Sequence, residues 1–304
     1  MLEEFQKRAV GWIKDRAVDR TIDAHVDLKS PTEVKARFRQ LVSQGGVPLV
    51  YANHEGHGDG IALAVVSEHL RNLVSRGDNY PLKGLAIILA KSMTNGAQSD
   101  DLKRSYEMLI DGGRRKGAEP ITVTREKDEE LYGMRRSTLA ELRPLREKLA
   151  EGFGVALLPA GTVQAGRHPE GKDIEDIYGM RKLTNRSLLD FYELMRKWLE
   201  PHGKWPFFQP VGLHGSFRLM QSADGGGAPK LTPIGKRSLM QTGPLGIALV
   251  KIETNMITPF DESELMQDLG QDWTKGVDRF NNYAMRIVAK GIPLNARGEY
   301  AFNP

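Results

Sequence analysis

Short runs of apolar residues alternate along this chain with longer stretches in which apolar residues recur every three or four positions. The short runs are typical of buried strands in a parallel sheet, and the periodic stretches are typical of amphipathic helices. The predicted strands cover residues 47–52, 83–90, 119–125, 154–159, 207–213 and 245–253. The predicted helices cover residues 2–20 and 31–43, the segments that follow the first two strands, and residues 128–151, 185–200 and 262–290.

This alternation predicts an α/β fold, in which helices flank a mixed, mostly parallel β-sheet. We expect residues 1–45 to form an N-terminal helical extension and residues 46–304 to form the α/β domain itself. Local signals sharpen two boundaries. The segment Ser30–Glu33 is a capping box with proline at the first helical position, and Pro144 should break the long helical stretch near Arg143.

The composition is ordinary for a soluble globular protein, with 40% hydrophobic and 27% charged residues in a chain of 304. The absence of cysteine excludes disulfides and cysteine-based metal sites, and it fits a reducing compartment. The longest apolar runs are far shorter than the ~20 residues that span a bilayer. The first residues do not have the pattern of a signal peptide. We therefore expect a soluble, cytoplasmic protein.

The formal net charge of +4 suits an anionic partner, such as a phosphorylated substrate, an acidic carrier protein or an anionic lipid surface. Nucleic acid is not an expected partner, because lysines and arginines are spread among nearly as many acids and form no basic and aromatic stripe. An amphipathic stripe of Phe5, Trp12 and Ile13 either packs on its own domain or makes a peripheral contact with a membrane surface.

The residues with the clearest chemistry follow the first strand of the predicted sheet. His54 and Asp59 stand five positions apart in a glycine-rich turn at the carboxyl end of that strand, where α/β sheets place their active sites. An imidazole that is oriented by a carboxylate can take a proton from a hydroxyl group. The chain has no cysteine nucleophile and no G-x-S-x-G serine. The pattern therefore favours direct attack by a substrate hydroxyl, without a covalent enzyme intermediate.

Two other interpretations of this turn stay open. In the simpler one, His54 caps a helix and Asp59 is an ordinary turn residue. In the other, His54, His57 and Asp59 bind a metal ion, as in a metal-dependent hydrolase. Their spacing does not match the helical H-E-x-x-H pattern, and Gly56 and Gly58 disfavour a helix here.

The turn Asn53–Asp59 resembles the first motif of the glycerolipid acyltransferases, an Asn-His-x₄-Asp sequence after a buried strand. Members of that family acylate glycerol 3-phosphate or lysophosphatidate from an acyl thioester. Three later segments resemble the other motifs of the family in order and spacing: Ile121–Arg125, Leu157–Thr162 and Phe208–Gly212. A further segment, Ile234–Arg237, is similar to one in the soluble, plastid-type glycerol-3-phosphate 1-acyltransferases, which are the closer likeness.

This resemblance implies a role for each matching residue. His54 and Asp59 would be catalytic, and Arg125 would hold the phosphate of the acceptor with help from Arg167. The further substrate-binding candidates are Asn53, Lys127, Gly161 and Thr162. The donor would be acyl-CoA or acyl-carrier protein, the acceptor would be glycerol 3-phosphate or a related (lyso)phospholipid, and no metal or cofactor is implied.

The third motif departs from the family pattern at two positions. Ala160 stands where the family has glutamate, and Val163 stands where it has arginine. The plastid-type branch also lacks the glutamate, and Arg167 follows within a few positions. These departures leave the identity of the acceptor open. They also leave a second hypothesis, in which the chain binds a lipid or an acyl thioester without turnover.

Overall fold

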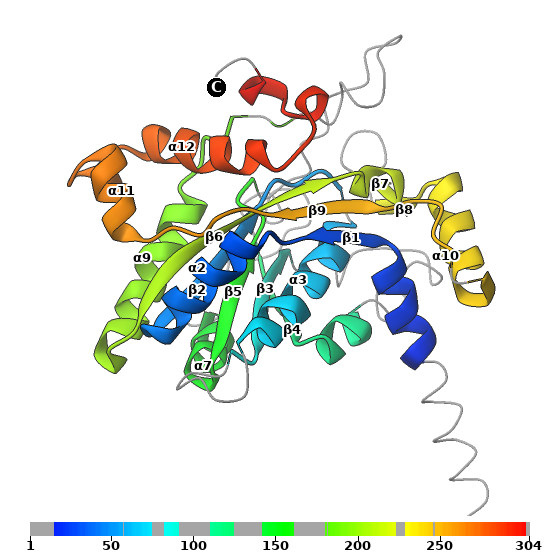
Figure 1. The fold of residues 1–304 in the computed structure, drawn as a ribbon, viewed down its shortest axis with the longest axis horizontal. Coiled ribbons are helices and arrows are strands. Elements are labelled where there is room, and N and C mark those ends of the chain that lie inside the picture. Colours follow the sequence, from blue (N-terminus) through cyan, green and yellow to red (C-terminus); the bar gives the residue numbers. More distant parts are fainter. Residues whose placement is uncertain are drawn as a thin grey trace, which may run out of the picture.

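Seven strands form the main sheet of the protein in the computed structural model, in the order β1-β9-β6-β2-β5-β3-β4 (Figure 1). The structure describes residues 15–56, 58–74, 82–90, 110–124, 142–160, 180, 182–222, 229–245 and 247–301. The strands of this sheet are β1 (Val26–Lys29), β2 (Gly46–Ala52), β3 (Gly84–Ala90), β4 (Ala118–Val123), β5 (Phe153–Leu157), β6 (Trp205–His214) and β9 (Ile252–Met256). Two short strands, β7 (Met220–Ser222) and β8 (Pro229–Leu231), form a separate antiparallel pair.

Five of the six strand pairings in the main sheet are parallel, and only β6 and β9 run antiparallel. The longer described helices are α2 (Thr32–Ser43), α3 (Asp59–Leu73), α7 (Arg143–Glu151), α9 (Ser187–Leu199), α10 (Pro233–Leu245), α11 (Glu262–Leu269) and α12 (Val277–Lys290). This arrangement confirms the predicted α/β fold with a mixed, mostly parallel sheet. None of the described helices is both long and apolar enough to cross a bilayer.

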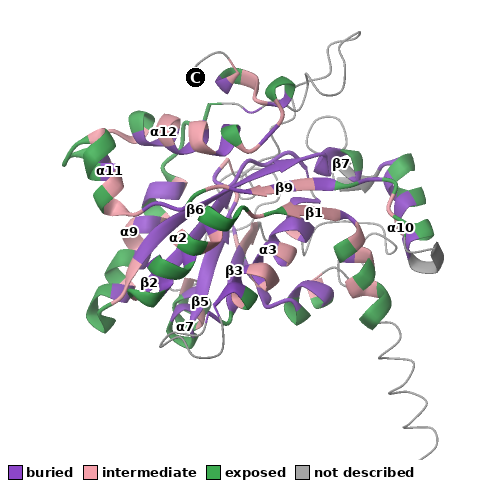
Figure 2. Ribbon diagram, in the orientation of Figure 1, coloured by how far each residue is buried: buried purple, intermediate pink, exposed green. Residues whose placement is uncertain are grey.

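Strand β2 lies at the centre of the sheet and is buried along its whole length (Figure 2). Its side chains alternate between two hydrophobic clusters because successive residues of a strand point to opposite faces. Val50 and Ala52 pack with α2 and α3 on one face, and Leu49 and Tyr51 pack with α7, α9 and α12 on the other. The helices thus cover both faces of the sheet, and the ends of its strands are left for polar chemistry.

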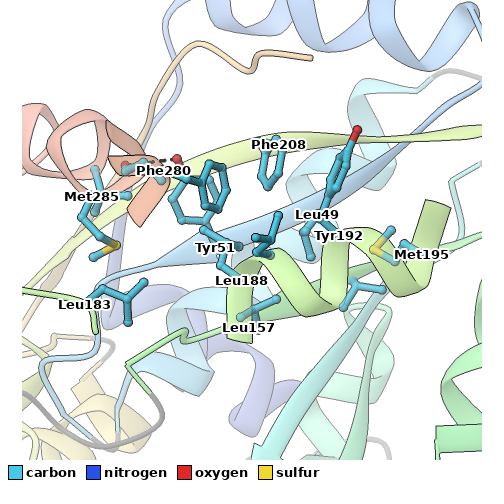
Figure 3. Close-up of a cluster of buried hydrophobic side chains, with 14 of the residues drawn as sticks. Leu49, Tyr51, Leu157, Leu183, Leu188, Tyr192, Met195, Phe208, Phe280 and Met285 are labelled. Carbon is cyan, nitrogen blue, oxygen red and sulfur yellow. Dashed lines mark hydrogen bonds between the residues drawn. The ribbon is translucent and has the colours of Figure 1, made fainter. Parts of the chain in front are cut away.

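The second cluster is built around the ring of Phe208 on β6 (Figure 3). Tyr192 and Phe260 stack on this ring at centroid distances of 4.8 and 5.2 Å. Tyr51 meets it edge-on, and the Tyr51 hydroxyl donates to the carbonyl of Ala284 at 3.1 Å. These contacts fix β2 and β6 against α9 and α12, so the carboxyl ends of the two strands are held at a constant position.

Helix α7 begins at Arg143 with Pro144 in its first turn, where the predicted break was placed, and residues 128–141 of the predicted helical stretch lie outside the described residues. The prediction is wrong for the segment 245–253, where the strand begins only at Ile252. Two features explain the difference: α10 extends to Leu245, and the Oγ of Ser238 accepts the backbone N–H groups of Leu249 and Val250. Those donors are therefore engaged by a side chain and do not enter a strand ladder.

Strands β1, β7 and β8 and helix α10 were not predicted from the sequence. Strand β1 falls inside the predicted N-terminal helical extension and pairs in parallel with β9. Helix α10 follows Thr232, whose Oγ1 accepts the N–H of Gly235 at 2.8 Å. A threonine before Pro233 is therefore a helix-start signal. The predicted capping box at Ser30–Glu33 is wrong, because α2 begins at Thr32 after Pro31 and no side chain caps its first turn.

His25 joins the N-terminal region to α10. Its Nδ1 donates to the carbonyl of Thr21 at 2.6 Å, and its Nε2 accepts from the hydroxyl of Ser238 at 2.8 Å. Both His25 and Ser238 are buried. This arrangement requires a neutral imidazole, and burial lowers the pKa of His25 below its ordinary value.

We expect acid to weaken the fold through His25. Because the pKa of His25 is lower in the folded chain, the unfolded chain takes up its proton first as the pH falls through 6.5. The stabilisation present at neutral pH is then lost at no more than about 1.4 kcal/mol per pH unit. Urea unfolding of the wild type and of His25→Gln, at about pH 7.5 and about pH 5.5, measures this term. An equal loss of stability in both proteins would contradict it.

Candidate active site

The loop that leaves β2 contains the predicted catalytic residues and ends at the first residue of α3, Asp59. Parallel strands direct their carboxyl ends to one edge of a sheet, and β2 shares this edge with its neighbours β5 and β6. Tight packing on both faces of β2 fixes where its loop begins. His54 is therefore placed by the central strand of the sheet.

The structure brings His54 and Asp59 into direct contact. The Nδ1 atom of His54 lies 2.8 Å from Oδ2 of Asp59. Asp59 is fully buried, and His54 is 8% exposed. With Nδ1 donating to a carboxylate, Nε2 is the ring nitrogen at which the imidazole can accept a further proton. This is the geometry of a general base whose tautomer is fixed by a carboxylate.

The position of Asp59 is itself held by the loop. Its Oδ2 also accepts the backbone N–H groups of Glu55 at 2.9 Å and Gly56 at 3.2 Å. Asp59 stands in the first turn of α3, where the positive end of the helix dipole stabilises a carboxylate. Its other oxygen, Oδ1, is buried and has no hydrogen-bond partner within the described part of the chain. All the observed bonds to the side chain therefore converge on the oxygen that orients His54.

Asn53, a predicted substrate-binding residue, is bound to the protein itself. Its Nδ2 donates to the carbonyl of Leu213 at 2.7 Å, and its Oδ1 accepts the N–H of Leu213 at 2.8 Å. The side chain is fully buried. Both polar groups of this amide are thus used to tie the loop to the end of β6, and the structure assigns Asn53 a positioning contact.

Two further candidates for the site, Glu55 and His214, were not predicted from the sequence. Glu55 is buried, and its Oε1 lies 3.0 Å from Nδ1 of His214 while its Oε2 accepts the N–H of Gly215 at 2.7 Å. Burial raises the pKa of Glu55 to about 7, even though the bonds from His214 and Gly215 act to lower it. His214 could have been found from the sequence, because it stands at the carboxyl end of a predicted strand, as His54 does.

The glycines of the loop allow a close approach to the turn Ser216–Arg218. A Cβ atom added to Gly56 would lie 2.9 Å from the backbone nitrogen of Phe217, which is closer than real contacts allow. A Cβ on Gly58 would lie 3.3 Å from the carbonyl oxygen of Ser216. At Gly60, by contrast, it would meet nothing within 4 Å. The first two glycines therefore serve packing between the loop and the segment after β6.

Gly56 and Gly60 form a matched pair of tests for this packing. Gly56→Ala should destabilise the fold by about 1–3 kcal/mol, because the added methyl group pushes against backbone atoms. Gly60→Ala lies in the first turn of α3 and should leave the stability equal or slightly higher. Thermal or urea unfolding of the two variants measures the difference. Equal destabilisation by both would show that space around Gly56 is not limiting.

Several predicted site residues lie outside the described part of the chain: His57, Arg125, Lys127, Gly161, Thr162 and Arg167. The described strands that precede them end at the same sheet edge as β2. Strand β5 is the immediate neighbour of β2, and β4 is three strand positions away, or ~14 Å at the usual strand spacing. Among the described residues, no group of three histidine, aspartate or glutamate side chains could hold a metal ion.

A scan of the chain against protein-family models gives no match, and a search of curated proteins gives none either. The assignment of the site therefore depends on its own geometry. That geometry is a buried His54–Asp59 pair at the carboxyl end of a central parallel strand. Around it, Asn53 and Glu55 bind the end of β6, and Gly56 and Gly58 pack against the turn that follows.

Proposed function

We propose that this chain is an O-acyltransferase that moves an acyl group from a thioester to a hydroxyl group of a phosphorylated glycerol-type acceptor. The observation that supports this most is the 2.8 Å contact between Nδ1 of His54 and Oδ2 of Asp59 at the active edge of the sheet. The order and spacing of the motifs that resemble the glycerolipid acyltransferases narrow the reaction to acyl transfer.

In the proposed reaction, Nε2 of His54 takes the proton from the acceptor hydroxyl while Asp59 stabilises the resulting imidazolium. The acceptor oxygen attacks the carbonyl carbon of the thioester and forms a tetrahedral intermediate. The carbon–sulfur bond then breaks, and the leaving sulfur takes the proton from the imidazolium. The ester and the free thiol are released, and the enzyme returns to its starting state without a covalent enzyme intermediate.

The substrate-binding part of the proposal comes from the resemblance. Arg125 would hold the acceptor phosphate through its guanidinium, with Arg167 and Lys127 as further cations. Gly161 and Thr162 would line the site with backbone N–H groups suited to a phosphate or an oxyanion. Acyl-CoA or acyl-carrier protein would be the donor. In this role the protein would work in the cytoplasm, with a peripheral contact at the membrane that receives its product.

The test is the release of thiol from acyl-CoA or acyl-carrier protein by the purified protein, with glycerol 3-phosphate, lysophosphatidate or no acceptor. Acceptor-dependent release, with the acylated product identified by mass spectrometry, is the expected result. Release without an acceptor would indicate a hydrolase, and sensitivity to a chelator would indicate a metal. Donor binding without release would favour the hypothesis of a binding protein, for which the replacement of glutamate by Ala160 argues.

A further inference from the structure

Glu55 is a buried carboxylate that the proposed reaction does not use. It is 1% exposed, and it stands next to His54 in the chain. Its side chain does not point toward its own loop neighbours. It reaches across to the end of β6, where it meets Nδ1 of His214 at 3.0 Å and the N–H of Gly215 at 2.7 Å. Burying a carboxylate costs free energy unless the charge is paired and hydrogen-bonded, as it is here.

The residues on both sides of His54 are fastened to the same short segment. Asn53 exchanges two hydrogen bonds with Leu213, and Glu55 binds the next two residues, His214 and Gly215. His54 is therefore held between two anchors that use three consecutive residues of one strand end. The main chain of Glu55 adds a third link, because its N–H donates to the Asp59 oxygen that orients His54.

We infer that Glu55 and His214 form a positioning pair, which holds His54 and Asp59 in their productive geometry by sharing one proton between the loop after β2 and the end of β6. The inference rests on the proposed function for its catalytic readout, and on the contacts alone for its structural part. Glu55 and His214 do not touch the reacting atoms in this role. They act through the backbone of the loop that places His54.

The charged groups around the pair favour one shared proton. Asp59 raises the pKa of Glu55 further after burial has done so. Burial acts to lower the pKa of His214, but the bond to Glu55 and the charges of Glu55 and Glu253 outweigh it and raise the pKa, with Arg218 opposing them. The proton is lost when the pH rises through the raised pKa of His214. Above that pH His214 is neutral. Its positive charge then no longer offsets the repulsion between the buried carboxylates of Glu55 and Asp59.

The variant Glu55→Gln keeps the hydrogen bonds of residue 55 but removes its charge, so it separates the two effects. A glutamine can still accept from Gly215 and donate to a neutral His214, so it reproduces the protonated pair at every pH. We expect the kcat of the wild type to fall about tenfold between pH 7 and pH 9.5 and that of Glu55→Gln to change less than about threefold. Glu55→Ala should lower kcat by about 10²-fold with little change in KM. A glutamine variant with the same alkaline fall as the wild type would overturn the inference.

Two controls complete the experiment. Glu147→Gln alters an exposed carboxylate on α7 and should match the wild type at every pH. The imidazole nitrogen signals of His214 in ¹⁵N NMR report the pair whether or not the protein transfers acyl groups. His214 should hold its proton to a higher pH in the wild type than in Glu55→Gln. If His214 titrates alike in both, the inference fails; if no acyl transfer occurs but His214 behaves as expected, only the proposed function fails.

Discussion

Replacing His54 by alanine should lower the rate of acceptor-dependent thiol release by about 10²–10⁴-fold, the usual contribution of a general base. The reason is geometric. Nδ1 of His54 is committed to Asp59 at 2.8 Å, so the ring is oriented and its Nε2 is the proton-accepting atom. The loss should fall on kcat, because the imidazole acts on the hydroxyl in the transition state and contributes little to holding the substrate.

His202 provides the matched control for that experiment. It is an exposed histidine after α9, far along the chain from the loop, and His202→Ala should leave the rate unchanged. Both proteins should show the same far-ultraviolet circular dichroism, since His54 contributes no large apolar surface to the core. Thiol release that survives in His54→Ala at the wild-type rate would remove the catalytic assignment.

Asp59 should be as sensitive as His54, and for two separable reasons. Asp59→Asn preserves the shape of the side chain, and its amide oxygen can accept the same hydrogen bonds as Oδ2, but it removes the negative charge that stabilises the imidazolium of His54. We expect kcat to fall about 10²–10⁴-fold with a modest change in stability. Asp59→Ala also leaves the N–H groups of Glu55 and Gly56 without their acceptor. That variant should lose about 3–5 kcal/mol in urea unfolding.

Asp190 is the corresponding control for the aspartate. It also lies in the first turn of a helix, α9, but its ion pair with Arg186 is exposed. Asp190→Asn should change the free energy of unfolding by less than about 1 kcal/mol and leave kcat unaltered. If Asp59→Asn were fully active, the carboxylate would be a structural residue of the loop and would have no part in orienting the base.

The sequence was sufficient to predict the strands that carry the site, because buried parallel strands are continuous apolar runs of limited length. The runs at 47–52, 154–159 and 207–213 each correspond to a strand with ends shifted by two residues at most. It failed where a distant side chain controls the backbone. The predicted strand start at Leu245 is the last residue of α10, and Ser238 binds the N–H groups of Leu249 and Val250 in another conformation.

The same limit applies to the candidate site. His54 and Asp59 could be predicted as a pair because both belong to one short loop and their spacing is a local feature. Glu55 could not be recognised as a site residue, since its partners His214 and Gly215 are about 160 positions away. Asn53 was assigned to the substrate for a similar reason. A polar residue beside a catalytic histidine suggests a ligand contact when the strand that binds it is not yet known.

The distance along the chain between the loop and its anchors also affects how the protein is made. His54 and Asp59 emerge early in synthesis, but β5 and β6, which flank β2, and the residues Leu213 to Gly215 follow much later. Strand pairings between residues so far apart in the chain form slowly, because the entropy of closing a long loop is lost before the contacts that stabilise the pairing form. A nascent chain that ends before β6 therefore contains His54 and Asp59 without the residues that hold their loop. The hydrogen bonds that support this loop can be complete only after residue 215 of 304 has been translated.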